Sequence, residues 1–420
     1  MPKRTRERVE IEPPAELRAA LRARGVPDAL IERALAAGIA VGSLWGWSNW
    51  RKLDAEDIER QITWHQRFTT GDLRAREVTE ADNAAFCDLW ENSPEEIGDL
   101  EITVLRGPDA FAQFRLQRNV HLQVIADGNV IVASCGWSRR NVEIAGQRTS
   151  VSYGQALRVH KDYRRQGLGD AVRMISGAMN AVAPSVGQYD IMRSGNFAVV
   201  GWWKKYVPDF FEGTPQRENE VPGLPVGVAQ IPALASAGGS PRVRPGRRED
   251  LGACVALLNR THGGLDLFRP YTEEFLEDQL DEGYWGERAP WFPTVYGWRD
   301  FHVLEVAGRI RACAGLWDRG RDLRERVRDK RSGAERVLAG TALLDWGYAE
   351  GAEDAMVELL AELAARTHAL GRDFLSAPLD HAPALAKRLE SLEPGVETRY
   401  LRWGNASPAI TRPYTDLRWW

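Results

Sequence analysis

The sequence predicts an α/β protein in which one mixed-sheet fold occurs twice in tandem, after a small helical region. Strand and helix patterns alternate from Asp72 onward, and a similar pattern begins again after a segment rich in Pro and Gly. A chain of 420 residues is long enough for two or three domains. We expect a helical region at 1–71, a first copy at 72–211, a linker at 212–241 and a second copy at 242–420.

The composition is typical of a soluble globular protein. Hydrophobic residues make up 44% of the chain and charged residues 27%, and the formal net charge is −4. This balance argues against a nucleic acid as the main partner, and no apolar run is long enough to cross a membrane. The charged start lacks the apolar core of a signal peptide, so we expect a cytoplasmic protein, either monomer or homodimer. The four cysteines form no CxxC pair and are expected to be buried thiols.

Capping signals predict helices in the N-terminal region. Asp28 precedes the segment 29–37, and Asp54 precedes the segment 55–68, which stops near Gly71. We expect these helices to pack onto the domain that follows.

The first copy shows alternating strand and helix patterns. Asp127-Gly128 stands between two apolar runs and favours a tight hairpin turn, and apolar residues alternate from Val151 to Val159. The expected elements are strands at 73–78, 121–126, 130–137 and 151–159, a helix ending at Trp90, and a helix that carries Val172–Val182.

Between Glu212 and Pro241 the hydrophobic periodicity disappears and Pro and Gly accumulate, which indicates a linker. Beyond it, Arg242-Val243-Arg244 and the apolar segment that follows resemble the start of the first copy. Ala307-Gly308 with Trp317 repeats the spacing of the earlier hairpin dipeptide and its Trp. These matches predict an internal duplication.

The most informative segment is Leu157–Ala171, where a strand meets a turn rich in Arg and Gly at the start of a helix. Gly167 and Gly169 lack a Cβ, so backbone N–H groups can converge there, and the helix N-terminus also attracts anions. The arrangement suits a phosphate or a pyrophosphate. The segment lacks the Lys-Ser/Thr of a Walker loop and the third glycine of a dinucleotide fingerprint.

With this motif the chain resembles the GNAT superfamily of acyl-CoA-dependent N-acyltransferases over residues 72–211. Arg164-x-x-Gly167-x-Gly169 is similar to the family's pyrophosphate-binding motif, and Val159 falls on the family's splayed strand. The resemblance implies acetyl-CoA as co-substrate, no metal, and an oxyanion held by the backbone N–H of Val159. It implies cofactor contacts from Leu157, Val159, Arg164, Arg165, Gln166, Gly167, Leu168, Gly169, Asp170 and Asn196.

The resemblance is weaker for the groups that transfer protons. Where the family usually has a tyrosine that protonates the departing thiolate, this chain has Trp203, and Tyr206 lies three residues further on. We expect Tyr206 as the general acid, with water or no acid as the alternative, because a thiolate is a tolerable leaving group. His160 is a weak candidate base, and Tyr153 and Gln155 occupy the strand positions where the family carries a Glu.

The acceptor side is expected to be a loop and a helix over Glu91–Arg118. Its acidic residues attract a cationic amine, although such a group also occurs as a solvated face. We place Glu101 from this segment, together with Tyr153, in the substrate site.

The second copy lacks the phosphate turn. Before its expected helix at 355–370 it carries Glu350, Glu353 and Asp354, which repel a pyrophosphate. His262 and His381 lack metal-ligand spacing and are expected in loops or caps.

We therefore expect a tandem GNAT protein with a degenerate second copy. Its expected activity is transfer of an acetyl group from acetyl-CoA to the primary amine of a small molecule. The alternatives are a longer acyl-CoA, a carrier-protein or an aminoacyl donor, and a non-catalytic CoA-binding scaffold.

Overall fold

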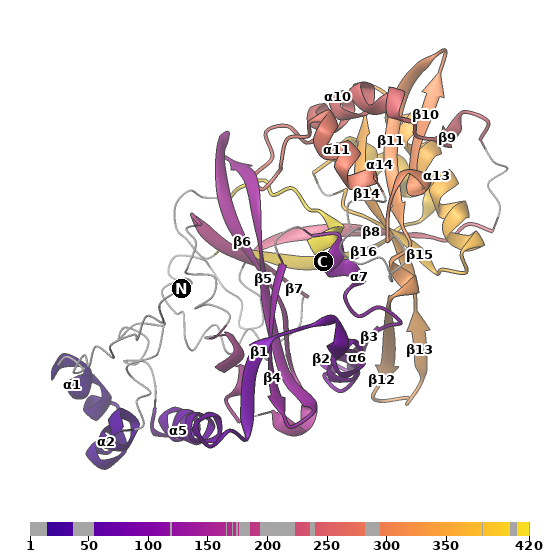
Figure 1. The fold of residues 1–420 in the computed structure, drawn as a ribbon. Coiled ribbons are helices and arrows are strands. Elements are labelled where there is room, and N and C mark those ends of the chain that lie inside the picture. The colour runs from indigo at the N-terminus through magenta and orange to yellow at the C-terminus, as the bar shows by residue number, and fades with distance from the viewer. Residues whose placement is uncertain are drawn as a thin grey trace.

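The computed structural model describes residues 15–36, 54–117, 120–164, 166–169, 171–173, 175, 185–193, 223–235, 240–281, 295–379, 381–403 and 410–419. In these residues the protein is an α/β molecule built around one large mixed sheet. Figure 1 shows the first half of the chain, in indigo and magenta, beside the second half, in orange and yellow, with strands β8 and β16 between them.

The large sheet confirms the predicted duplication. Its strand order is β1-β4-β5-β6-β7-β16-β8-β15-β14-β11-β10-β9. Counted from each edge toward the centre, the strands of the two halves occur in the same order, so β1 corresponds to β9 and β7 corresponds to β15. The first half supplies β1 (Leu73–Glu77), β4 (Val120–Asp127), β5 (Val130–Ile144), β6 (Gln147–Val159) and β7 (Gly187–Arg193). The second half supplies β9 (Val243–Pro245), β10 (Phe301–Val306), β11 (Arg309–Trp317), β14 (Gly340–Tyr348) and β15 (Phe374–Ala377).

The two halves exchange their last strands, which are β8 for the first half and β16 for the second. β8 (Leu224–Pro232) pairs with β15 of the second half, whereas β16 (Gly395–Trp403) pairs with β7 of the first half. β8 and β16 also pair with each other at the centre of the sheet. The predicted linker is therefore wrong over 224–232, where Val226 and Val228 are buried in the core. The prolines around this segment favoured a linker in the sequence analysis, and the strands that pair with β8 lie more than 100 residues away in the sequence.

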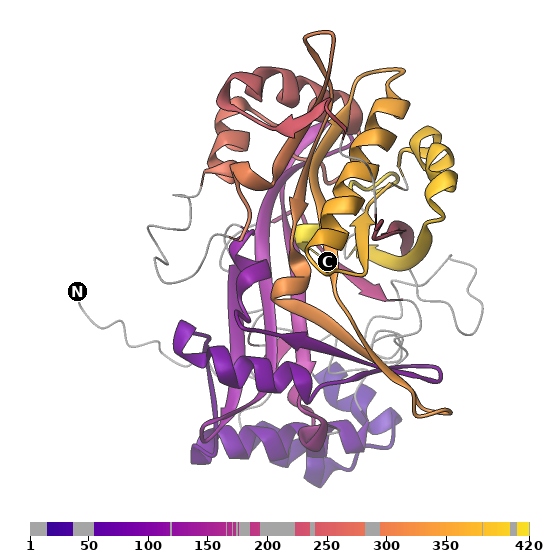
Figure 2. The same cartoon turned by 90° about the vertical axis from the view of Figure 1, so that its right-hand side faces the viewer.

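A small second sheet also joins the halves. Its order is β13-β12-β3-β2, with bounds β13 (Glu335–Leu338), β12 (Leu323–Asp329), β3 (Leu100–Arg106) and β2 (Glu95–Ile97). β3 of the first half pairs antiparallel with β12 of the second half, and Figure 2 shows these indigo and orange strands side by side. The predicted loop and helix over 91–118 is thus wrong for β2 and β3, because pairing across the halves favours the extended conformation there. Among the described residues later in this range, α7 (Ala112–Arg115) is helical.

Helices cover both faces of the large sheet. In the N-terminal region α1 (Ala15–Ala23) and α2 (Asp28–Ala36) precede α5 (Ala55–Thr70), which has the predicted Asp54 cap and ends at Gly71 with a φ of 85°. The first half adds α6 (Asn83–Glu91), and the second half adds α10 (Leu251–His262), α11 (Glu273–Leu280), α13 (Glu353–Ala369) and α14 (Pro383–Arg388).

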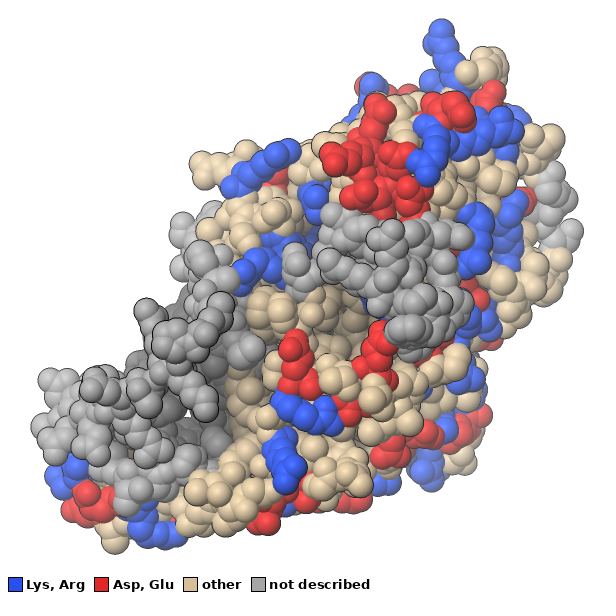
Figure 3. Space-filling model, in the orientation of Figure 1, with Lys and Arg blue, Asp and Glu red and all other residues tan. Residues whose placement is uncertain are grey.

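Basic and acidic side chains are interspersed on the face drawn in Figure 3, and acidic ones gather over α11. This agrees with the net charge of −4. Within the described residues, no helix is long and apolar enough to cross a membrane.

Candidate functional site

Strands β6 and β7 lie side by side in the first half but pair over only a short stretch. Within the described residues, parallel pairing joins Val151–Tyr153 to Gly187–Tyr189. β6 continues unpaired with β7 to Val159, and β7 continues to Arg193. The strands are parallel and pair only near their amino ends. Their carboxyl ends therefore lie apart and leave an opening in the sheet.

A β-bulge lies where β6 turns away. The register of β5 against β6 shifts after Ser134, and Ala156 has a φ of 56°. The Ser134 hydroxyl donates a hydrogen bond of 2.7 Å to the Ala156 carbonyl oxygen, which holds the bulge in place. A bulge bends its strand and increases the local twist, so it accounts for the divergence of β6 from β7.

β6 leads directly into the glycine-rich turn. His160 begins the 3₁₀ turn η2 (Lys161–Tyr163), and its Nδ1 accepts a hydrogen bond of 3.3 Å from a backbone amide two residues on. Gly167 has a φ of 77°, in the left-handed region that favours glycine, and Leu168 and Gly169 are helical. The first-turn amides of a helix have no acceptor within the helix, so this turn presents N–H groups to an anion.

Two polar side chains of the turn contact neighbouring elements. Arg164 donates a hydrogen bond of 2.6 Å to the Pro94 carbonyl oxygen, and burial together with repulsion from Arg158 lowers its pKa. Gln166 accepts a hydrogen bond of 3.3 Å from Arg67 of α5. The N-terminal helical region therefore helps to position the turn.

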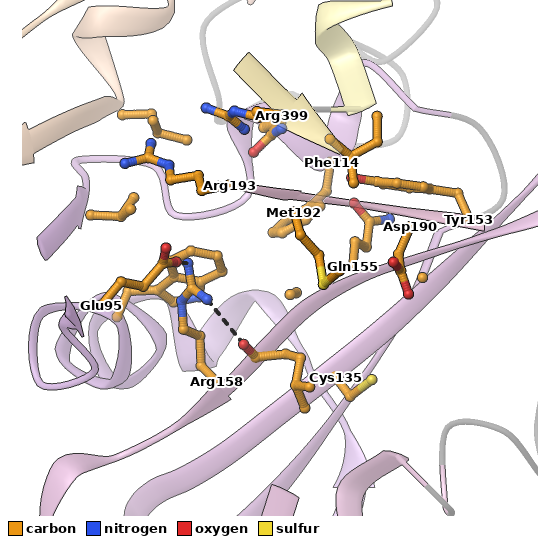
Figure 4. Close-up of a pocket in the computed structure, with 18 of the residues that line it drawn as sticks. Glu95, Phe114, Cys135, Tyr153, Gln155, Arg158, Asp190, Met192, Arg193 and Arg399 are labelled. Carbon is orange, nitrogen blue, oxygen red and sulfur yellow. Dashed lines mark hydrogen bonds and ion pairs between the residues drawn. The ribbon is translucent and has the colours of Figure 1, made fainter. Parts of the chain in front are cut away.

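A cavity of about 190 Å³ occupies the opening between β6 and β7. Its wall includes both strands, α6, β2 and β3 of the first half, and η6 (Arg319–Arg321), β12 and β16 of the second half. Both halves thus form one site. Figure 4 labels ten of the lining residues: Glu95, Phe114, Cys135, Tyr153, Gln155, Arg158, Asp190, Met192, Arg193 and Arg399.

Two guanidinium groups contact one indole ring in the cavity wall. The Cζ atoms of Arg106 and Arg158 lie 4.0 Å and 4.2 Å from the Trp90 ring centroid. Arg158 also forms an ion pair with Glu95. Burial opposes ionisation of Glu95, but Arg158 and Arg193 outweigh it and lower the pKa of this carboxyl. Glu95 is therefore an ionised partner of arginine and a poor acceptor of a proton at neutral pH.

The structure brings Tyr153 to the cavity but not Glu101. The Tyr153 hydroxyl donates a hydrogen bond to the Trp419 carbonyl oxygen, and burial raises its pKa, so it stays protonated. Val104 and Arg106 of β3 line the cavity. Since alternate side chains of a strand point to opposite faces, Glu101 on the same strand points away from it.

The predicted cofactor residues fall into three groups. Leu157 lines the cavity, and Val159 lies two residues further on, at the end of β6. Arg164, Gln166, Gly167, Leu168 and Gly169 form the turn described above. Arg165, Asp170, Asn196 and Tyr206 lie outside the described residues.

The sequence analysis did not find several charged residues of the cavity, among them Asp190, Arg193, Arg319 and Arg399. Alternating apolar residues in the segment Gly187–Arg193 are a signal for β7 and hence for the first two. No local signal points to Arg319 or Arg399, because their position depends on how the second half pairs with the first.

The second half retains the bulge but closes the opening. The register of β11 against β14 shifts in the same way, and Asp345 has a φ of 44°, at the position equivalent to Ala156. The next residue, Trp346, is 1% exposed and belongs to the core beneath α13. The first turn of α13 carries Glu353 and Asp354 in place of a glycine turn. In its described residues, this half therefore has neither the opening nor the glycine turn of the first.

Two histidines that the sequence leaves in loops or caps contact each other in the second half. His262 Nδ1 lies 3.0 Å from His381 Nε2, and His262 Nε2 lies 2.6 Å from the Trp346 carbonyl oxygen. Burial, followed by repulsion from His381, lowers the pKa of His262 well below its ordinary value. In the described part of the chain, no group of three or more His, Cys, Asp or Glu side chains is arranged to hold a metal.

Comparisons with known proteins concern the fold. No family model and no curated protein sequence matches the chain. N-myristoyltransferase from Saccharomyces cerevisiae with bound myristoyl-CoA superposes with a TM-score of 0.54 at 12% identity, over 81% of this chain and 86% of that chain. A further structure of that enzyme with myristoyl-CoA has a TM-score of 0.50 at 14% identity, over 81% and 83% of the two chains. A GCN5-related N-acetyltransferase from Sphaerobacter thermophilus has a TM-score of 0.44 at 17% identity, over 83% and 98%. The chain has the duplicated GNAT fold.

Proposed function

We propose that the chain is an acyl-CoA-dependent N-acyltransferase whose first half transfers an acetyl group from acetyl-CoA to the primary amine of a small molecule. The observation that carries the proposal is the separation of β6 from β7, with a cavity between the strands and a glycine turn at the end of β6. An elongated thioester needs an anion site for its pyrophosphate and a channel for its arm. The likeness to the N-myristoyltransferase fold supports the same assignment.

In the proposed reaction a neutral amine attacks the thioester carbonyl, and the carbon–sulfur bond breaks as the tetrahedral intermediate collapses. The Val159 amide is the proposed donor to the oxyanion, and Tyr206 is the proposed acid for the thiolate. Asp190 lines the cavity from β7 and is the proposed acceptor of the amine proton, because Glu95 is already held by Arg158. Asp190→Asn is then expected to lower kcat while acetyl-CoA binding persists.

The length of the acyl group has a second candidate. The superposed N-myristoyltransferase holds myristoyl-CoA, which favours a long-chain donor as the alternative. Initial rates with acetyl-CoA and with myristoyl-CoA, with mass spectrometry of the product, separate the two. A higher kcat/KM for acetyl-CoA supports the proposal, and a higher value for myristoyl-CoA supports the alternative.

Gly167 and Gly351 offer a matched test of the anion site. Both have left-handed backbones, with φ of 77° and 66°, and both precede the helix that follows equivalent strands β6 and β14. Alanine at either position is expected to cost about 1–2 kcal/mol of stability. Only Gly167→Ala is expected to weaken acetyl-CoA binding, by about tenfold or more, because re-aiming one amide loses a charged hydrogen bond worth about 1.5–3 kcal/mol.

Isothermal titration with acetyl-CoA measures the affinity of each variant. Urea unfolding tests whether the two variants lose the same free energy of unfolding. Wild-type affinity in Gly167→Ala, or an equal loss in Gly351→Ala, would contradict the assignment of the turn.

A further inference from the structure

Arginine outnumbers carboxylate in the wall of the cavity. Among the described lining residues there are six arginines and three acidic side chains. The acidic ones are Glu95, Asp190 and Glu325, and the arginines are Arg106, Arg158, Arg173, Arg193, Arg319 and Arg399. A site of this kind does not suit an amine that carries only positive charge.

At least three of the arginines have carboxylate partners. Arg158 pairs with Glu95, and Arg193 pairs with Glu325. Arg399 donates a hydrogen bond of 2.8 Å from Nε to Glu397, which is not one of the lining residues. These pairs use up most of the acidic groups and leave a surplus of positive charge.

Arg106 is buried without a carboxylate partner in the described part of the chain. The residue is 8% exposed, and its Nη atoms donate to the Ala110 carbonyl oxygen at 3.0 Å and to Gln113 Oε1 at 2.9 Å, both neutral acceptors. Its Nε has no hydrogen-bond partner there, and its guanidinium lies over Trp90. A buried charge without a counter-charge is costly, and an anionic ligand in the cavity would offset that cost.

Arg319 reaches the same cavity from the second half. It lies in η6, just before β12, and lines the wall together with Arg106. Burial, followed by repulsion from Arg399, lowers the pKa of Arg319 to about 10. Burial and repulsion from Arg158 and Arg319 lower the pKa of Arg106 to about 9. Both groups therefore lie where a negative charge is favoured.

We propose that Arg106 and Arg319, one from each half, bind an anionic group of the acceptor, so that the acceptor is a small amine that also carries a carboxylate or a phosphate. This inference rests on the N-acyltransferase function proposed above. It also assigns a role to the second half, which supplies one of the two arginines that recognise the acceptor.

Three amines with a common aminoethyl unit test the proposal: ethanolamine, β-alanine and phosphoethanolamine, whose far ends are a hydroxyl, a carboxylate and a phosphate. With acetyl-CoA saturating, so that its own phosphates are already bound, kcat/KM is expected to be at least about tenfold higher for an anionic amine than for ethanolamine. The ratio of β-alanine to phosphoethanolamine tells which anion is preferred.

Variants at the two arginines locate the effect. Arg319→Gln and Arg106→Lys are expected to raise KM for the preferred anionic amine about tenfold or more, with little change in kcat and none in KM for ethanolamine. Arg319→Lys is expected to restore part of the affinity. Arg388→Gln is the matched control, because Arg388 of α14 forms an exposed ion pair with Asp354 of α13 and lies outside the cavity lining.

Separate readouts distinguish failure of this inference from failure of the proposed function. Acetyl-CoA binding with equal turnover of all three amines supports the transferase and overturns the anion site. A loss of acetyl-CoA affinity in Arg319→Gln also overturns it, because the arginine then serves the donor. If no amine is acetylated, the affinities of the three amines for the CoA-saturated protein test the inference. Tighter binding of an anionic amine supports it, and equal binding or a preference for ethanolamine refutes it.

Discussion

Leu157→Trp is expected to close the channel of the first half in the way the second half closes its own. Ala156 and Asp345 are equivalent bulge residues with φ of 56° and 44°, so Leu157 corresponds to Trp346. Leu157 lines the cavity of about 190 Å³, whereas Trp346 is 1% exposed and fills the corresponding space beneath α13. An indole at residue 157 would therefore occupy the path proposed for the donor's thioester arm.

The expected effect on binding follows from the part of the donor that is excluded. Losing burial of three or four methylene-sized groups, at about 0.8 kcal/mol each, removes about 2.8 kcal/mol and raises the Kd for acetyl-CoA about 100-fold. The fold is expected to tolerate the change within about 1 kcal/mol, because Leu157 is only partly buried and faces a cavity. Isothermal titration gives the Kd, and urea unfolding gives the free energy of unfolding.

Trp346→Leu is the reciprocal control. Removing a fully buried indole is expected to cost about 2 kcal/mol or more of stability and to leave acetyl-CoA binding unchanged. If Leu157→Trp binds acetyl-CoA within threefold of wild type, or if Trp346→Leu loses that binding, the arm does not pass between β6 and β7 and the reasoning fails.

Three further predictions concern stability and are measured by urea unfolding. Gly136→Ala places a Cβ 2.4 Å from Leu122 Cδ2 and is expected to cost about 3 kcal/mol; a cost under 1 kcal/mol would show that the strand yields. Burial opposes ionisation of Glu397, but its arginine neighbours outweigh it and lower its pKa from 4.5 to about 2. Its contribution, about 3 kcal/mol, is therefore complete above pH 4.5 and lost as the pH falls toward 2, so the stability gap between wild type and Glu397→Gln narrows over that window. A gap independent of pH refutes this. Tyr153→Phe leaves the buried carbonyl oxygen of Trp419 without its donor and is expected to cost about 1–3 kcal/mol, whereas no change would mean that the hydrogen bond adds nothing.

Elements whose signals are local could be predicted from the sequence. The predicted Asp54 cap is present on α5, where it is part of a capping box with Asp57, and the Asp127-Gly128 dipeptide forms the turn between β4 and β5, with a φ of 58° at the glycine. The glycine turn after β6 also follows from a short segment, because Gly167 must adopt a left-handed backbone there. In each case the information lies within a few residues.

Elements whose conformation depends on the other half could not be predicted. β3 is a strand because β12 pairs with it, and β8 is a strand because β15 and β16 lie on either side. The cavity also depends on contacts between the halves, because the pairing of β12 with β3 brings the neighbouring Arg319 to the cavity wall. Local sequence patterns do not indicate which distant strands pair with each other.

The exchange of β8 and β16 has a consequence for how the protein folds. Until residues 395–403 have been synthesised, β7 has an open edge where β16 later pairs. The first half therefore cannot finish its sheet while it leaves the ribosome, although its motif residues are complete early. Pairings this distant in sequence form slowly, and an uncovered strand edge is a site of aggregation meanwhile. Synthesis of the second half thus sets the time at which the cavity between β6 and β7 is complete.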